Sequence, residues 1–220
     1  MAGTITISAS FGAGGSIVGR RVAERLGLPF FDRAIPATVA QRLAIPMDEA
    51  EAQDERAPSA WQRLAQAFAN VATPVGPQPV PSVPGAPRSF REETERFLRQ
   101  TCESTGGVVL GRAGMIVLRD RPDVLRVRLD GPPEARLAQY LRFEDVDEQT
   151  ARQLQRDVDR AREGYVRVFY HARQSDPRLY HLVIDSTAVS LATCTDLIVE
   201  AAQDLLARSL LSQNDSAAPL

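Results

Sequence analysis

Lysine is absent from this chain of 220 residues, because all 26 of its lysine or arginine positions hold arginine. A site that elsewhere uses a lysine must therefore use arginine or leave the position without charge. The planar guanidinium clamps a phosphate through two hydrogen bonds, whereas an ammonium acts as a compact point charge. Cysteine is also scarce. Cys102 and Cys194 cannot form a disulfide framework, and no cysteine and histidine cluster has the spacing of a zinc site.

Long apolar runs and a large net charge are absent as well. No stretch of about 18 apolar residues is present, so no membrane-spanning helix is expected. The first residues lack the basic and apolar regions of a secretory signal, and a cytoplasmic protein is expected by default. The net charge of −2 gives no reason to expect nucleic acid or an anionic membrane as partner. The sequence leaves the oligomeric state open.

Short apolar runs alternate with helical patterns along most of the chain. We predict strands at residues 4–8, 28–31, 108–110, 125–129 and 182–184, and helices at 16–26, 89–105, 112–118, 132–141, 147–173 and 190–206. The second of these helices begins with a capping box formed by Ser89 and Glu92. This alternation is typical of an α/β protein whose parallel sheet carries helices on both faces.

One domain is expected over residues 1–208, followed by a flexible tail at 209–220. Residues 34–88 begin with a loosely helical pattern at 34–72. The last part, 73–88, contains six prolines and two glycines and is expected to be disordered. Residues 147–173 form a long, arginine-rich helix.

A glycine-rich loop joins the first predicted strand to the first predicted helix. It has the sequence ASFGAGGS over residues 9–16, against the phosphate-loop pattern G-x-x-x-x-G-K-S/T. Gly14 and Ser16 match this pattern, whereas Ala9 replaces the first glycine and Gly15 stands in the place of the lysine. Backbone amides and the positive end of the helix would still cradle phosphate oxygens, and the Ser16 hydroxyl would ligate Mg²⁺.

Two other interpretations of this loop stay open. The loop can be a merely structural turn, in which Ser16 serves only as a helix cap. It can also be a dinucleotide fingerprint that starts with Gly12 and Gly14 and uses Asp32 to bind a ribose. The third glycine of that fingerprint should stand at position 17, where the chain has Ile17.

Polar residues also follow the other predicted strands. Asp32, Arg112, Asp130 and Asp185 all lie at a strand's carboxyl end, which is where α/β sheets bind their ligands. Together with the glycine-rich loop they predict a single site at that edge of the sheet. Asp32 could instead cap a helix, and Asp130 could instead be a turn residue.

Four stretches of the chain are similar to the cytidylate kinase-like family, relatives of bacterial cytidylate kinase, and they occur in the same order. They are ITISASFGAGGSIVGRRVAERLGLPFFD at 5–32, VVLGRAGMIVL at 108–118, RDVDRAR at 156–162 and YHLVIDSTAVSLATCTDLI at 180–198. The resemblance spans nearly the whole chain. It implies a P-loop NTPase-like three-layer α/β/α fold with a parallel five-stranded sheet. It also implies a helical lid at 147–173 and an insertion on the acceptor side at 34–88.

The same resemblance implies transfer of the γ-phosphoryl group of ATP to a nucleoside monophosphate with Mg²⁺, and CMP or dCMP is the first expectation. Loop amides would hold the donor phosphates, Arg112 would grip the acceptor phosphate, and lid arginines would close over the transferring group, with Asp159 orienting the lid. The implied catalytic residues are Arg112, Arg156, Asp159, Arg160 and Arg162. The implied ATP-binding residues are Ser10, Phe11, Gly12, Ala13, Gly14, Gly15, Ser16 and Ile17. Asp32, Arg112 and Asp185 would bind substrate, and Ser16 would be the magnesium ligand.

Two departures from the family pattern keep other functions open. Gly15 removes the loop lysine, which favours a regulatory module that binds nucleotide without turnover. Ala113 stands where cytidylate kinases carry an aspartate that helps to bind the acceptor, so a kinase of another small molecule is a third possibility. The lid-like arginines alternate with Asp157 and Asp159, a pattern that is equally typical of a solvated helix face.

Overall fold

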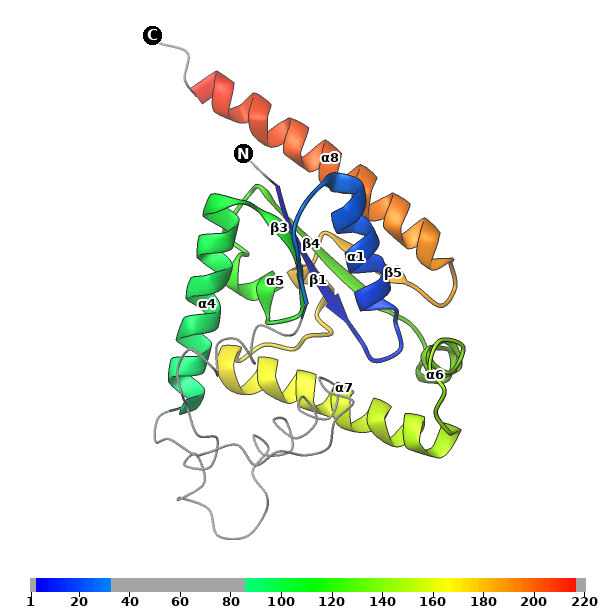
Figure 1. The fold of residues 1–220 in the computed structure, drawn as a ribbon. Coiled ribbons are helices and arrows are strands. Elements are labelled where there is room, and N and C mark those ends of the chain that lie inside the picture. Colours follow the sequence, from blue (N-terminus) through cyan, green and yellow to red (C-terminus); the bar gives the residue numbers. More distant parts are fainter. Residues whose placement is uncertain (1–2, 33–85, 217–220) are drawn as a thin grey trace. The chain divides into compact units, whose positions relative to one another are not determined.

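The structure, a computed structural model, describes residues 3–32 and 86–216 (Figure 1). The loosely helical part of the predicted insertion and most of its proline-rich part lie outside the described residues. The chain divides into two compact units. We call residues 1–32, 98–140 and 177–220 the sheet unit, and residues 33–97 and 141–176 the helical unit.

A five-stranded sheet forms the centre of the sheet unit. Its strands are β1 (Thr4–Ala9), β2 (Phe30–Phe31), β3 (Gly107–Leu110), β4 (Val124–Asp130) and β5 (Leu182–Asp185), in the order β2-β3-β1-β4-β5 (Figure 1). Every pairing is parallel. The predicted α/β fold with a parallel five-stranded sheet is confirmed, and the carboxyl ends of the strands share one edge.

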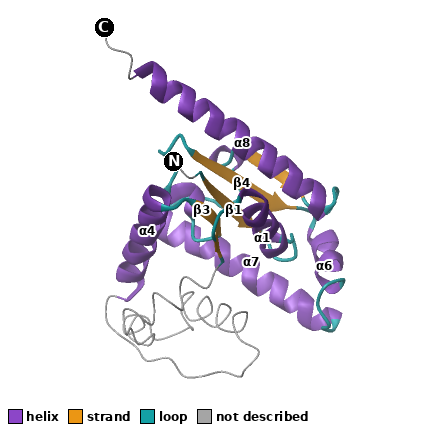
Figure 2. Ribbon diagram, turned by 45° about the horizontal axis from the view of Figure 1, so that its top comes forward, coloured by secondary structure: helices purple, strands orange, loops and turns teal. Residues whose placement is uncertain are grey.

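One face of the sheet is apolar and packs against helices α1 (Gly15–Leu26) and α8 (Leu191–Ser216). Side chains alternate along a strand, so every second residue of β1 and β4 lies on this face. The shared core includes Ile5, Ile7, Leu125, Val127 and Leu129 from these strands, Val18 and Val22 from α1, and Cys194 and Ile198 from α8. Figure 2 shows both helices beside the strands. Helix α8 runs to Ser216, beyond the predicted end at 206, and no glycine or proline interrupts it.

The other face of the sheet carries polar side chains. Thr4, Thr6 and Ser8 of β1 are buried there, and Arg126 and Arg128 occupy the matching positions of β4. The short helix α5 (Gly114–Val117) packs on this side, with the Met115 sulfur 3.4 Å from Ser8 Oγ. Polar groups therefore reach the carboxyl edge of the sheet from this face.

The remaining helices are α4 (Ala86–Ser104), α6 (Pro133–Leu141) and α7 (Glu148–Tyr170), with a short 3₁₀ turn at Pro177–Leu179. The Asp147 carboxylate caps α7 by accepting a hydrogen bond from the Thr150 amide (2.9 Å), which agrees with the predicted helix at 147–173. The predicted start of α4 at Ser89 is wrong. The helix begins at Ala86, because Pro87 is tolerated in a first helical turn. None of the described helices is long and apolar enough to cross a membrane.

Candidate functional site

The glycine-rich loop makes a sharp turn between β1 and α1. Gly12 and Gly14 have left-handed φ angles of 76° and 72°. A Cβ atom on Gly12 would lie 2.2 Å from the carbonyl oxygen of Arg136, so the turn requires glycine there. Helix α1 begins at Gly15, with Gly14 as its N-cap and no side-chain cap. The interpretation of Ser16 as a helix cap is therefore wrong, because left-handed Gly14 starts the helix earlier.

The first turn of α1 provides a site for an anion. The first amides of a helix have no carbonyl acceptor inside the helix, and they carry the partial positive charge of its N-terminus. No side chain caps these amides in α1, and Ser16 Oγ has no hydrogen-bond partner among the described residues. The amides of Gly15, Ser16 and Ile17 can therefore hold the oxygens of a phosphate group.

The position of the missing lysine has no room for a side chain. A Cβ atom on Gly15 would lie 2.5 Å from the Cβ atom of Ala9 and 3.1 Å from Cδ1 of Leu110. Ala9 and Gly15, the two departures from the phosphate-loop pattern, are thus coupled by a direct steric contact. The methyl group of Ala9 fills the space that residue 15 would need, so the loop can hold Ala9 or a lysine at position 15, but not both in this geometry.

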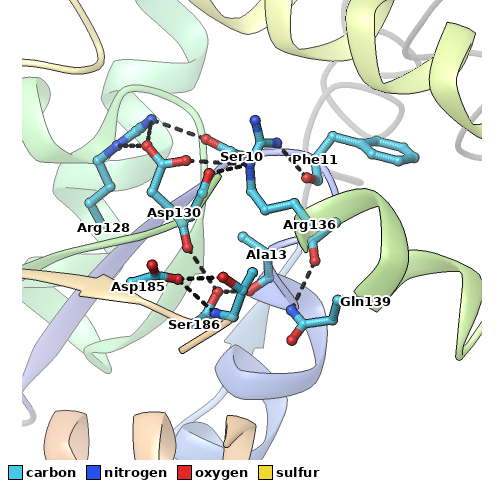
Figure 3. Close-up of polar contacts among 12 residues, drawn as sticks. Ser10, Phe11, Ala13, Arg128, Asp130, Arg136, Gln139, Asp185 and Ser186 are labelled. Atoms are coloured by element: carbon cyan, nitrogen blue, oxygen red, sulfur yellow. Dashed lines mark hydrogen bonds and ion pairs between the residues drawn. The ribbon is translucent and has the colours of Figure 1, made fainter. Parts of the chain in front are cut away.

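Side chains of helix α6 form hydrogen bonds and a ring contact with the glycine-rich loop. Arg136 Nη1 donates to the Phe11 carbonyl (2.6 Å), and Gln139 Nε2 donates to the Gly12 carbonyl (2.9 Å) (Figure 3). The Phe11 and Tyr140 rings pack with centroids 4.4 Å apart. These contacts engage two loop carbonyls and stabilise the conformation of the loop. Sequence reasoning missed all three α6 residues, because no local pattern marks them.

A second network of polar groups lies at the end of β4. The Arg128 guanidinium donates from Nε and Nη2 to Asp130 Oδ2 (3.1 and 2.6 Å) and from Nη2 to Ser10 Oγ (3.0 Å) (Figure 3). Arg136 Nε lies 3.6 Å from the other oxygen of Asp130. Burial favours the neutral carboxyl, but the charge of Arg128 and hydrogen bonds from Ser10 and Arg128 outweigh it. The pKa of Asp130 therefore lies below its usual value.

In this network, the side chains of Asp130 and Ser10 both bind Arg128. The Asp130 carboxylate accepts hydrogen bonds from Arg128 and forms an ion pair with Arg136, which goes beyond its predicted alternative as a turn residue. Ser10 is predicted to bind ATP as part of the loop, and its hydroxyl is engaged with Arg128 and Asp130 inside the protein. Ser10 therefore joins the loop to β4 through its side chain.

The end of β5 is tied to the loop by a residue that sequence reasoning missed. The Ser186 hydroxyl is fully buried and lies within hydrogen-bond distance of the carbonyls of Ala13 (2.9 Å) and Asp130 (3.2 Å). The neighbouring Asp185 is exposed and closes a turn. Its carboxylate accepts hydrogen bonds from the Thr187 hydroxyl (2.6 Å) and amide (2.9 Å), which hold the pKa of Asp185 below its usual value.

Arg112 follows β3 in a backbone conformation that is unusual for its residue type. Gly111, Arg112 and Ala113 have consecutive left-handed φ angles of 82°, 62° and 51°. Such a conformation costs a residue other than glycine about 1 kcal/mol, and it often occurs at functional sites. Arg112 as a residue is only 8% exposed. The sheet unit thus contributes a buried guanidinium from the same edge as the glycine-rich loop.

The other predicted site residues are divided between the two units. The loop residues 10–17, Arg112 and Asp185 follow β1, β3 and β5, and Asp32 follows the edge strand β2. Arg156, Asp159, Arg160 and Arg162 lie on α7 in the helical unit. Within α7, Arg156 is exposed and its guanidinium donates to the Gln153 side chain. The role of these α7 residues stays a prediction.

Comparison with solved structures finds the same fold. An uncharacterized protein from Eubacterium ventriosum ATCC 27560 aligns with a TM-score of 0.65 at 20% identity, over 91% of this chain and 98% of that one. A gluconokinase from Sinorhizobium meliloti 1021 aligns at 16% identity over 98% of both chains, with a TM-score of 0.48. A shikimate kinase from Acinetobacter baumannii aligns at 17% identity over 97% of this chain and 95% of that one, with a TM-score of 0.43. The first of these likenesses supports the fold, and the two weaker ones carry no further argument.

Comparison with protein families identifies the chain. No curated protein matches its sequence. The profile of the cytidylate kinase-like family matches residues 4–188, which include the sheet, the glycine-rich loop, Arg112 and α7. This match confirms the resemblance seen in the four sequence stretches: the chain belongs to the cytidylate kinase-like family.

Proposed function

We propose that this chain is an ATP-dependent phosphotransferase that transfers a phosphoryl group to a nucleoside monophosphate, with CMP or dCMP as the first acceptors to test. One observation carries the proposal. The uncapped N-terminus of α1, which can hold phosphate oxygens, shares the carboxyl edge of the sheet with the buried and strained Arg112. A phosphoryl-transfer site needs these two anion-binding groups, one for the donor and one for the acceptor.

The residues of the loop fit the phosphates of ATP and a magnesium ion. The free amides of Gly15, Ser16 and Ile17 would bind the donor phosphates, and the loop shape would be maintained by Arg136 and Gln139. No group of three or more acidic, histidine or cysteine side chains that could hold a metal occurs in the described part of the chain. Mg²⁺ usually keeps several waters and is held largely by substrate phosphates, and the Ser16 hydroxyl would be its ligand from the loop. The ion would neutralise charge on the transferring phosphoryl group.

The protein would accelerate the reaction by positioning and by charge neutralisation. Arg112 would bind the acceptor phosphate as a fork, with Asp32 and Asp185 near the acceptor nucleotide. Arg156, Arg160 and Arg162 on α7 would supply positive charge to the transferring group, and Asp159 would orient them. Closure of this helix over the nucleotides would exclude water and suppress hydrolysis of ATP.

Two observations favour a second candidate function. Ala9 excludes a lysine from position 15, and Ala113 offers no side-chain acceptor for a base or ribose next to Arg112. A module that binds nucleotide without turnover does not need a lysine at position 15, and a kinase of another small molecule does not need a polar side chain at position 113. The acceptor phosphate, rather than the base, is the part of CMP that Arg112 would recognise.

We expect Ser16→Ala to weaken the binding of ATP in the presence of Mg²⁺ by about tenfold, because one metal ligand is lost, while binding without Mg²⁺ changes little. Isothermal titration calorimetry with and without Mg²⁺ measures both. Ser190→Ala is the matched control, because Ser190 Oγ accepts from the Thr193 amide (3.0 Å) at the start of α8 and lies outside the loop. Equal Mg·ATP affinity of Ser16→Ala and the parent protein would contradict the role given to Ser16.

A further inference from the structure

Arg128 is a buried arginine whose guanidinium lies at the carboxyl edge of the sheet. It stands on the polar face of β4, two positions before the strand ends at Asp130. Its Nη2 reaches Ser10 in the glycine-rich loop, and its Nε and Nη2 reach Asp130. The guanidinium carbon lies 6.0 Å from the centre of the Tyr180 ring, which favours a cation there. The Arg128 side chain is only 9% exposed.

One nitrogen of this guanidinium lacks an acceptor. Nη1 of Arg128 is buried and has no hydrogen-bond partner among the described residues, whereas Nε and Nη2 are both bonded. A buried donor without an acceptor is destabilising, and such groups often mark a site that a ligand or a water completes. The missing acceptor would therefore bind to a guanidinium that already contacts Ser10 of the loop through its other terminal nitrogen.

Arg126 shows what a purely structural arginine on the same strand looks like. It lies two residues earlier on the same polar face, and its guanidinium donates from Nε to the Leu179 carbonyl (3.0 Å) and from Nη1 to the Arg119 carbonyl (3.0 Å). Backbone carbonyls thus use the guanidinium of Arg126. Arg128 is instead held in place by a carboxylate and a hydroxyl, with one donor left over at the ligand-binding edge.

We propose that Arg128 is a further anion-binding residue, which donates from Nη1 to a phosphoryl oxygen at the carboxyl edge of the sheet, beside the glycine-rich loop. This inference rests on the proposed function and deepens it. The loop has no lysine and no space for one, so positive charge must reach the phosphates from another element. A guanidinium fixed by Asp130 and Ser10 supplies that charge with little loss of side-chain entropy on binding. The oxygen can belong to the γ-phosphate of the donor or to the phosphate of the acceptor.

The test is equilibrium binding of Mg·ADP, Mg·AMPPNP and CMP to the parent protein and to Arg128→Met by calorimetry. Arg126→Met is the matched control, since it removes the same charge from the same face of β4. Loss of one charge-assisted hydrogen bond predicts an affinity for the recognised ligand about 10- to 100-fold lower in Arg128→Met than in the parent. Circular dichroism checks the fold. If Arg128→Met does not fold, the double variant Arg128→Met/Asp130→Asn removes the buried guanidinium together with the partly exposed carboxylate that it pairs with, and takes its place.

The pattern of losses identifies the source of the oxygen. A loss for Mg·AMPPNP but not for Mg·ADP assigns Arg128 to the γ-phosphate, and a loss for CMP assigns it to the acceptor phosphate. Unchanged affinities in a variant whose parent binds these ligands would overturn the inference, leave the proposed function intact and indicate an internal water at Nη1.

Failure of the proposed function has a different signature. If the parent protein binds none of the three nucleotides, the proposed function is wrong, and pyrophosphate becomes the probe. Pyrophosphate binding that weakens in Arg128→Met but not in Arg126→Met would still support an anion site at Arg128. Pyrophosphate binding that is absent, or equal in both variants, would overturn the inference as well.

Discussion

Replacing Arg112 by alanine is expected to lower kcat/KM for the acceptor nucleotide by about 10²- to 10³-fold, the usual cost of removing one donor that stabilises charge in the transition state. The guanidinium is buried at the sheet edge, and its backbone is held in a left-handed conformation. The strained turn thus places a buried arginine at the carboxyl edge of the sheet. Steady-state kinetics with a varied acceptor at saturating Mg·ATP measure the loss.

Three further variants separate this effect from a general loss of structure. Arg112→Lys keeps the charge but loses the fork, so it should recover only part of the activity. Arg112→Gly should have a free energy of unfolding about 1 kcal/mol higher than that of Arg112→Ala, because glycine adopts a φ of 62° without strain. Its activity should be as low as that of Arg112→Ala. Arg119→Ala removes an exposed arginine after α5 and should retain activity. Unchanged acceptor kinetics in Arg112→Ala would show that the acceptor site is wrongly placed.

Introducing the lysine of the phosphate-loop pattern at position 15 is expected to destabilise the protein. Gly15→Lys should lower the free energy of unfolding by about 1–3 kcal/mol, since its Cβ would lie 2.5 Å from Ala9 Cβ. It should not raise phosphoryl transfer, because the loop must distort to accept the side chain. Urea denaturation measures the first effect, and a coupled kinase assay measures the second.

The matched variant of this experiment is Ala9→Gly/Gly15→Lys. Removing the Ala9 methyl group removes the nearest contact, and the next neighbour, Cδ1 of Leu110 at 3.1 Å, would need to move by only a few tenths of an ångström. The double variant should therefore be more stable than Gly15→Lys alone. A single Gly15→Lys variant that is as stable as the parent would contradict the steric coupling of positions 9 and 15.

Local sequence patterns are sufficient to predict the sheet and the location of the loop. The alternation of Thr4-Ile5-Thr6-Ile7 predicts β1, and the glycines that follow predict a turn into a helix. Each of these features depends on residues that are neighbours in the sequence, so secondary-structure preferences are enough. The same holds for the strand ends that carry Arg112 and Asp185.

Contacts between distant residues could not be predicted in this way. Arg136 and Phe11 are 125 positions apart, and Arg128 and Ser10 are 118 positions apart. Their pairing depends on β4 lying beside β1, which is a property of the sheet order rather than of either segment. The start of α1 was misplaced for a related reason: Gly14 begins the helix through its φ angle, whereas the sequence showed only Ser16 as a capping side chain.

The central claim is that this site transfers a phosphoryl group to a nucleoside monophosphate. The most direct test is an assay with Mg·ATP against a panel of ribo- and deoxyribonucleoside monophosphates that includes CMP, dCMP and UMP. We predict diphosphate formation well above the background with ATP alone, and the preferred base will identify the acceptor. No transfer to any member of the panel by a protein that still binds ATP would contradict the claim, and would favour a nucleotide-binding module or a kinase of another small molecule.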